Sequence, residues 1–263
     1  MTATTTNPPG APLGVGSIIG ESFSILLRHF FAVMLLSLVP TLLNIVISGL
    51  LNGWGVALGV SDPVAADGGF IVRTIIALVV QMVLGGVTTA LLVQMAYDAK
   101  LQRPLQLGRY VGPAVNASLP IAILGLGAGI LAGLGFIALI IPGLWIYAVY
   151  SMMPAAVVIE KVGFGGLGRS AALTKEYRWP IVGAVVLLGI IGAVIGFVSI
   201  FLVGLLLAAI GNAGFGIVVG VLVLAALSTI GAGLGSISVA LIYARLREIK
   251  EGTSVRDIAA VFD

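Results

Sequence analysis

Apolar residues along the chain gather into six long runs that are separated by shorter polar stretches. The third run, from Leu119 to Ile141, carries no charged residue. It is long enough to cross the hydrocarbon core of a bilayer, which is about 30 Å thick and takes about 20 helical residues. Pro142 and Gly143 follow and predict a tight turn, because proline lacks the N–H that the next helical turn needs and glycine tolerates positive φ. The runs predict membrane spans at about residues 30–51, 70–97, 119–141, 144–159, 179–207 and 215–243.

Polar and apolar residues alternate in Ser17–His29, before the first run, and this favours an amphipathic helix in the membrane interface. Prolines at Pro120 and Pro180 are predicted to lie in the first turn of the third and fifth spans, where a missing N–H costs least. We therefore expect an all-α polytopic membrane protein with six transmembrane helices arranged as three hairpins, each preceded by a cytoplasmic interfacial amphipathic helix. Six spans with inside-positive loops would give the same pattern, so a true threefold repeat stays open.

Residues 1–14 hold Pro8, Pro9 and Pro12 and are predicted to be disordered, without the basic segment of a cleavable signal peptide. Residues 15–243 are then one membrane domain. Residues 244–263 are predicted to be a charged cytoplasmic tail that ends in a short helix capped by Ser254.

Composition agrees with this class, because 60% of the residues are hydrophobic and 9% are charged, against about 25% charged in soluble domains. With six spans, every lysine and arginine except Arg73 lies on the side that holds both termini and the stretches 98–118 and 160–178. The positive-inside rule then predicts that both termini are cytoplasmic. The net charge of +3 is explained by topology and anionic lipid, and we expect no nucleic-acid partner.

Glycines spaced four residues apart place small surfaces on one helix face, where another backbone can approach closely in lipid. On this basis we expect close helix packing at Gly125, Gly129, Gly133, Gly192, Gly196, Gly231 and Gly235.

Three uncharged polar residues lie inside predicted spans: Asn44, Gln81 and Gln94. Polar side chains in lipid prefer to face the bundle, so hydrogen bonding to neighbouring helices is expected, with a translocation pathway as the alternative. Arg73, near the start of the second span, is expected to snorkel to the interface or to contact a headgroup or a partner carboxylate.

Glu160 closes the fourth span and is expected to form a salt bridge that holds the following interfacial helix to the bundle, with contact to a lipid, a partner, an ion or a substrate as the alternative. The basic residues of the cytoplasmic rim are candidates for contact with anionic lipid or a partner, although topology alone would also place them there. These residues are Lys100, Arg103, Arg109, Arg169, Lys175 and Arg178.

No catalytic constellation can be assembled from this sequence, which has no cysteine and one histidine, His29. A metal site needs several ligands and a general base needs a positioned partner. We expect no cofactor, no metal and no enzymatic activity. The leading hypothesis is a scaffold or accessory subunit that packs against lipids and a membrane-protein partner or a second copy. The alternative is a small transporter or lipid-handling protein, with Asn44, Gln81 and Gln94 in a polar cavity and Arg73 or Glu160 at its mouths.

Short motifs resemble the membrane domain of glycerophosphoryl diester phosphodiesterases and the UPF0259-type bacterial inner-membrane proteins. The motifs are Ile141-Pro142-Gly143-Leu144, Val158-Ile159-Glu160, Gly168-Arg169-Ser170, Leu173-Thr174-Lys175, Trp179, Leu241-Ile242-Tyr243, Leu246-Arg247 and Glu251-Gly252. Ala171 stands where that family usually has an aromatic residue, and Glu176 where it usually has glycine. The resemblance implies a six-helix module of the bacterial inner membrane, without the soluble catalytic domain of the full enzymes.

Overall fold

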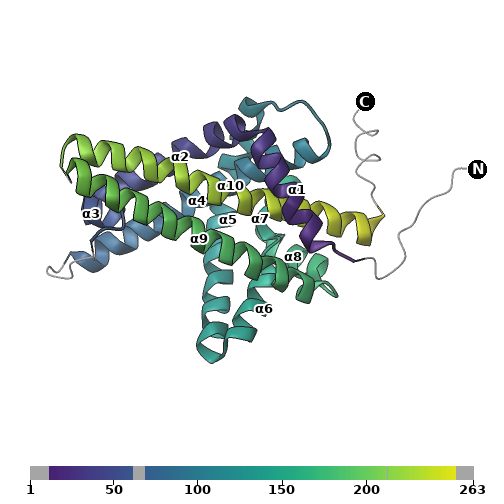
Figure 1. Cartoon of the computed structure of the whole chain (residues 1–263). Helices are drawn as coiled ribbons and strands as arrows, with labels where there is room; N and C mark the ends of the chain where they lie inside the picture. The colour runs from purple at the N-terminus through teal and green to yellow at the C-terminus, as the bar shows by residue number, and fades with distance from the viewer. Residues whose placement is uncertain (1–11, 62–68, 212, 253–263) are drawn as a thin grey trace, which may run out of the picture.

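The computed structural model describes residues 12–61, 69–211 and 213–252, and this part of the chain is helical with no β-strand (Figure 1). Six stretches are long and apolar enough to cross a membrane: α2, α4, α5, α6 with α7, α9 and α10. The all-α fold class with six candidate spans is thereby confirmed. The helices are α1 (Val15–Arg28), α2 (Phe30–Asn52), α3 (Trp54–Ala57), α4 (Phe70–Lys100), α5 (Leu107–Ala138), α6 (Ile140–Tyr150), α7 (Met153–Ile159), the 3-10 turn η1 (Gly163–Gly165), α8 (Gly166–Thr174), α9 (Arg178–Ile210) and α10 (Phe215–Glu251).

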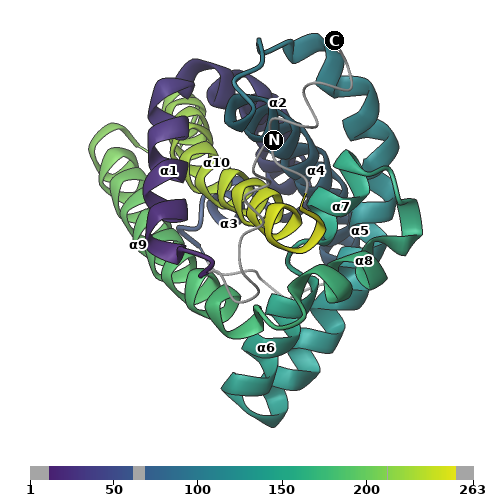
Figure 2. The same ribbon diagram turned by 90° about the vertical axis from the view of Figure 1, so that its right-hand side faces the viewer.

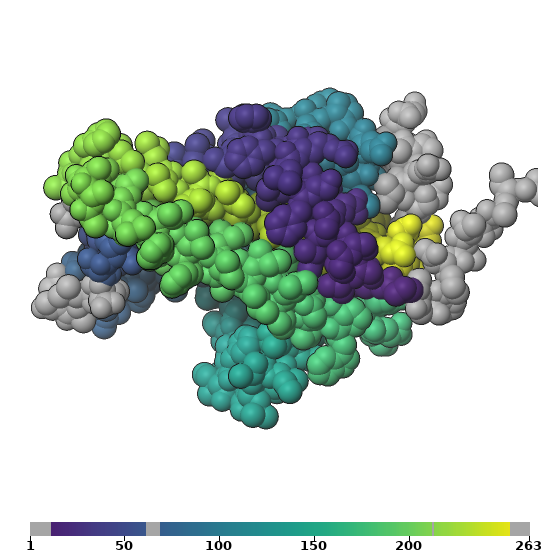
Figure 3. Space-filling view, viewed as in Figure 1, coloured from purple at the N-terminus to yellow at the C-terminus, as the bar shows by residue number. Residues whose placement is uncertain are grey.

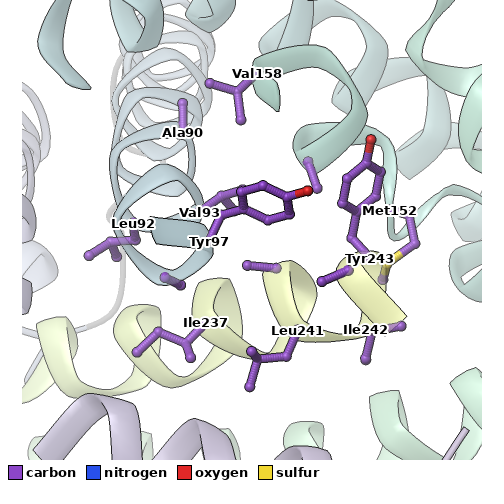
Figure 4. Packing of buried hydrophobic residues seen from close by; sticks show 14 of the residues in the cluster. Ala90, Leu92, Val93, Tyr97, Met152, Val158, Ile237, Leu241, Ile242 and Tyr243 are labelled. Carbon is purple, nitrogen blue, oxygen red and sulfur yellow. The ribbon is translucent and has the colours of Figure 1, made fainter. Parts of the chain in front are cut away.

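Helix α10 is the central element and packs against α9, α2, α4 and α1 (Figure 2). Its second half is buried almost without interruption, from Ile237 to Leu246. The main core lies where this half meets the end of α4 and the short helix α7 (Figure 4). Tyr97 of α4 and Tyr243 of α10 approach each other there, with ring centroids 6.5 Å apart.

Helices α5 and α6 form a pair that points away from the rest of the bundle at its far end. Figures 1 and 2 both show this pair diverging from α9 and α10, and Figure 3 shows its tip as a separate lobe. The two helices touch closely at Gly135 and Gly143: a Cβ built on Gly135 would lie 2.9 Å from the Gly143 Cα. The hairpin of α5 and α6 therefore needs these two glycines for close approach rather than for positive φ.

The predicted turn at Pro142-Gly143 is placed too late. Helix α5 ends at Ala138, Leu139 is extended with φ −167° and ψ 155°, and α6 begins at Ile140. Pro142 therefore lies in the first turn of α6, where a missing N–H is tolerated. The fourth span is also interrupted between Tyr150 and Met153, which the sequence did not indicate.

The prediction of a separate interfacial helix before the third span is wrong, because α5 runs unbroken from Leu107 with Pro113 and Pro120 inside it. Tyr110, Ala114 and Ala117 fall on one face of α5 and are buried. This face is buried because α5 packs against α4, and the packing explains why the helix begins before the predicted span. Separate helices do precede the first and fifth spans, as α1 and α8.

Helix α10 continues past Tyr243 to Glu251, so the first residues of the predicted tail are helical. Its last two turns carry basic and acidic side chains that pair with one another and with α8. The predicted N-terminal disorder falls largely on residues 1–11, and the predicted Ser254 cap on residues 253–263, all outside the described residues.

Candidate functional sites

Charged and tyrosine side chains from four elements meet where α7 ends. Glu160 directly follows α7, Arg169 lies on α8, and Tyr97 lies near the end of α4. Helix α10 contributes side chains at four-residue spacing, which places them on one face. We call this set the Glu160 cluster: Tyr97, Glu160, Arg169, Tyr243, Arg247 and Glu251.

Two arginines bridge two carboxylates in the Glu160 cluster. Arg169 donates from Nε and Nη2 to the two oxygens of Glu160, both at 2.7 Å, and also pairs with Glu251. Arg247 Nε lies 2.8 Å from Glu251 Oε2 and 3.5 Å from Glu160 Oε1. The Tyr243 hydroxyl donates to Glu160. The salt bridge predicted between Glu160 and the helix that follows is thus present.

The cluster is balanced in charge, with two guanidinium groups and two carboxylates. The hydrogen bond to Glu160 raises the pKa of the Arg169 guanidinium above its ordinary value, burial opposes the rise, and Glu251 adds to it. A bidentate arginine–carboxylate pair of this kind fixes orientation as well as charge. Because both carboxylates are paired with arginines, the cluster holds α7, α8 and α10 together.

Sequence reasoning missed the contribution of α10 to this cluster. Tyr243, Arg247 and Glu251 are spaced at four-residue intervals, which is the signal for one helix face, but the predicted span ended at Tyr243. A second tie joins the same helices, because Lys250 Nζ donates to the Ala172 carbonyl of α8 at 3.1 Å.

The remaining basic residues of the predicted rim have different surroundings. Lys100 Nζ lies 2.6 Å from Glu21 of α1, and the Arg178 guanidinium carbon lies 4.4 Å from the ring centroid of Trp145. Arg103 is half-buried. Arg109 and Lys175 are exposed. The rim is therefore divided between residues that tie helices together and residues that face outward.

The three intramembrane polar residues also differ in their surroundings. Gln94 donates to the Tyr110 carbonyl of α5 at 3.1 Å, as predicted for a residue that joins helices. Gln81 is exposed, so the prediction that it faces the bundle is wrong. Gln81 and Gln94 are thirteen residues apart, and at about 100° per residue their side chains lie about 140° apart around α4. Asn44 is half-buried on α2, and among the described residues its side chain has no hydrogen bond.

Replacing Gln94 by leucine is expected to destabilise the protein by about 0.6–1.5 kcal/mol, because the hydrogen bond between α4 and α5 is lost. Gln81→Leu on the same helix is the matched control and is expected to be neutral or slightly stabilising, because the exposed amide is replaced by an apolar side chain. Thermal unfolding of the purified variants measures both, and equal shifts would contradict the assignment of Gln94.

The polar residues of α4 are spread along the length of the helix. Arg73 is half-buried in the first turn of α4, and Gln94 lies 21 residues along the same helix, roughly 30 Å away at 1.5 Å per residue. This separation is about the thickness of the hydrocarbon core, so it does not test a pathway across the membrane, and the transport alternative stays a prediction.

The predicted close packing at the spaced glycines is wrong within the chain. A Cβ built on Gly129, Gly133, Gly192, Gly196 or Gly235 would meet no heavy atom within 4 Å, and at Gly125 and Gly231 the nearest atom is 3.9 Å away. Close approach occurs at other glycines: a Cβ at Gly233 would lie 2.7 Å from Val33 Cγ1, and one at Gly86 would lie 3.3 Å from the Ser118 carbonyl oxygen. Four-residue spacing marks a smooth face but does not identify what covers it.

A comparison with protein-family models gives no match, and comparisons with curated proteins and with solved structures give none either. The resemblance drawn from the short motifs therefore stays a prediction. One local feature bears on it: Glu176, at the position where that family usually has glycine, has φ +74°, a conformation that glycine adopts without strain.

Proposed function

We propose that this protein is a non-enzymatic membrane module, a scaffold or accessory subunit whose helix α9 packs against a transmembrane helix of another subunit. The observation that carries the proposal is the exposure of α9. Its 18-residue apolar window is only 6% buried, the lowest share among the six candidate spans in the described part of the chain.

The outward face of α9 is rich in glycine. Gly189, Gly192 and Gly196 lie within about 60° of one another around the helix, and a Cβ on any of them would meet nothing within 4 Å. Glycine is about 1 kcal/mol less favourable than alanine in a helix interior, and contact with lipid does not require it. Helix pairs in membranes do use such faces, because small residues allow backbones to approach. A second helix is therefore the fitting occupant.

We further propose that both termini face the cytoplasm of a bacterial inner membrane. Support comes from the distribution of lysine and arginine, which leaves Arg73 alone on the other side. The alternative, a small transporter or lipid-handling protein, stays a prediction.

The experiment is native mass spectrometry of the tagged full-length chain after gentle extraction from its own membrane. We expect an assembly of fixed stoichiometry that is lost in Gly192→Leu/Gly196→Leu, because leucine at these positions blocks close approach, and a Cβ at either position meets no atom of the chain within 4 Å.

Gly183→Leu is the matched control. Gly183 is also exposed on α9 and has open space beyond its Cβ position, but it lies at least about 120° around the helix from the other glycines. Its assembly should remain intact. A wild-type chain that is always monomeric, or an assembly that survives the double substitution, would refute the proposal.

A further inference from the structure

The hairpin of α5 and α6 is too short on its α6 side for a full crossing of the membrane. Helix α6 has 11 residues and ends at Tyr150. At 1.5 Å per residue it is about 16 Å long, which is roughly half of the hydrocarbon core. An apolar helix of this length is more typical of a segment that enters a membrane and returns than of one that crosses it.

The interruption that follows α6 is held in place by α8. The Ser170 hydroxyl donates to the Val149 carbonyl at 2.7 Å and accepts a hydrogen bond from the Met152 N–H at 3.2 Å. The Thr174 hydroxyl lies 3.2 Å from the same carbonyl, and both hydroxyl side chains are buried. Non-helical backbone persists at membrane depth only where the protein satisfies its polar groups. The interruption is therefore a fixed feature of the fold rather than a frayed helix end.

One contact between α6 and α9 indicates the depth of the hairpin. The Arg178 guanidinium carbon lies 4.4 Å from the ring centroid of Trp145. Arg178 is the first residue of α9 and follows the charged residues Lys175 and Glu176, so its guanidinium marks the level of the headgroups on that side. The Trp145 side chain lies at the same level. Ile140, the first residue of α6, is only five residues, or about 8 Å of helix, beyond Trp145.

Two further observations agree with this depth. Trp145, Tyr147 and Trp179 are all exposed close to this level, as aromatic residues commonly are at a bilayer interface. In Figure 1 the hairpin runs across the direction of α9 and α10 rather than beside them, and Figure 2, turned by 90°, still shows it pointing away from them. The hairpin therefore lies near the beginning of α9 and does not follow that helix through the membrane.

The tip of the hairpin is apolar throughout. Its residues Ile137–Ile141 include no polar side chain, and its isoleucine and leucine residues are between 63% and 84% exposed. The two stretches that the topology places on the opposite side of the membrane, 52–69 and 211–214, both hold polar residues. Because water disfavours an exposed turn made only of apolar side chains, hydrocarbon is the fitting surrounding for this tip.

The backbone of the tip also suits hydrocarbon, in which unpaired polar groups are costly. The Leu139 N–H donates to the Gly135 carbonyl at 2.9 Å, and the Gly143 N–H donates to the Leu139 carbonyl at 3.4 Å. Pro142 has no N–H, which removes one of the donors that the start of a helix leaves unpaired.

We propose that the α5–α6 hairpin is a re-entrant element whose tip ends within the cytoplasmic leaflet, where acyl chains of that leaflet cover its exposed surface. The chain then crosses the membrane through α2, α4, α9 and α10. Both termini still lie on one side, because a re-entrant hairpin returns to the side from which it enters. The assignment to the cytoplasmic leaflet rests on the orientation proposed above, which the control variants test separately.

The test is labelling of single-cysteine variants of the full chain in membrane vesicles of known orientation, with a maleimide that cannot cross the membrane. The chain has no cysteine, so each variant carries one reactive thiol. Leu139→Cys and Tyr147→Cys replace exposed side chains and should fold. Labelling in detergent checks that both thiols are reactive.

A re-entrant hairpin and a full crossing give opposite labelling patterns. For the re-entrant hairpin, Tyr147→Cys is labelled from the cytoplasmic side and Leu139→Cys is labelled from neither side. If α6 and α7 crossed the membrane together, Leu139→Cys would be labelled from the opposite side. Tyr147→Cys, about 12 Å further into the bilayer, would then be protected from both sides. That second pattern would overturn the proposal.

Lys175→Cys and Ala213→Cys are the matched controls for the two sides, because both residues are exposed. We expect labelling of Lys175→Cys from the cytoplasmic side only and of Ala213→Cys from the opposite side only. A reversed pattern in both controls would show that the proposed orientation and the assigned leaflet are wrong. The pattern of Leu139→Cys and Tyr147→Cys, compared with Lys175→Cys, would still decide whether the hairpin is re-entrant.

Purified protein in phospholipid vesicles identifies what covers the tip. With maleimide supplied on both sides of these vesicles, Leu139→Cys should stay unlabelled, because lipid is the only other component present. If Leu139→Cys is protected in its own membrane and becomes labelled in the vesicles, a protein partner covers the tip. That result would overturn the assignment to acyl chains.

Discussion

Replacing Glu160 by glutamine is expected to destabilise the protein by about 2–4 kcal/mol. Glu160 accepts two hydrogen bonds from Arg169 and one from Tyr243, and its side chain is only 17% exposed. Glutamine keeps the size of the side chain but removes the charge, so two guanidinium groups then share one carboxylate. Breaking a buried pair by removing one partner costs about 3–5 kcal/mol, and the partial exposure of Arg169 and Arg247 places this cluster at the lower end.

The measurement is thermal unfolding of the purified protein in detergent. Glu248→Gln is the matched control, because Glu248 pairs with Arg245 at 2.6 Å on the same helix but the two side chains are 36% and 31% exposed. Such surface pairs contribute about 0–1 kcal/mol, so the control should unfold close to the wild type. Equal losses in the two variants would show that the Glu160 cluster does not hold α7, α8 and α10 together.

Arg169→Gln provides an independent check on the ion pair between Glu160 and Arg169. If the two residues act through one ion pair, the double variant Glu160→Gln/Arg169→Gln should be less destabilised than the sum of the two single variants. The double variant restores the balance of charge, with Arg247 facing Glu251 at 2.8 Å. Strict additivity would mean that each residue acts through other contacts.

The number and approximate places of the spans could be predicted from the sequence, because a run of about 20 apolar residues is a local property of the chain. The ends of the helices could not. Pro120 was predicted to begin a helix and Pro142 to end one, yet Pro120 lies inside α5 and Pro142 inside α6. Contact with α4 extends α5 through its proline, and such contacts are not visible in a local pattern.

The same distinction applies to the candidate sites. Glu160 and Arg169 are nine residues apart, and a salt bridge from Glu160 to the helix that follows it was predicted. Tyr243 is 83 residues from Glu160, and its hydroxyl reaches that carboxylate only because α10 packs beside α7. A pocket of about 430 Å³ likewise joins residues 12–15 with residues 176, 177 and 180. Sequence spacing indicates partners within one helical segment, whereas these sites depend on packing between distant segments.

The glycines of α5 illustrate this limit most directly. Gly133 belongs to the four-residue pattern that suggested close packing, and Gly135 lies outside it. In the structure the roles are reversed, because a Cβ on Gly133 would meet nothing within 4 Å. A Cβ on Gly135 would lie 2.9 Å from the Gly143 Cα and 3.0 Å from the Gly143 nitrogen. Those are backbone atoms of α6, which cannot move aside as a flexible side chain could.

Alanine substitutions two residues apart are therefore expected to have opposite effects on thermal unfolding. Gly135→Ala should destabilise the protein by about 1–3 kcal/mol, because α5 and α6 must separate to admit the methyl group. Gly133→Ala should stabilise it by up to about 1 kcal/mol, because alanine favours the helix and has room. A shift of the same sign in both variants would contradict the close contact between α5 and α6. The pair shares one helix and one chemical change, so any difference in sign reports the packing of the hairpin rather than helix propensity.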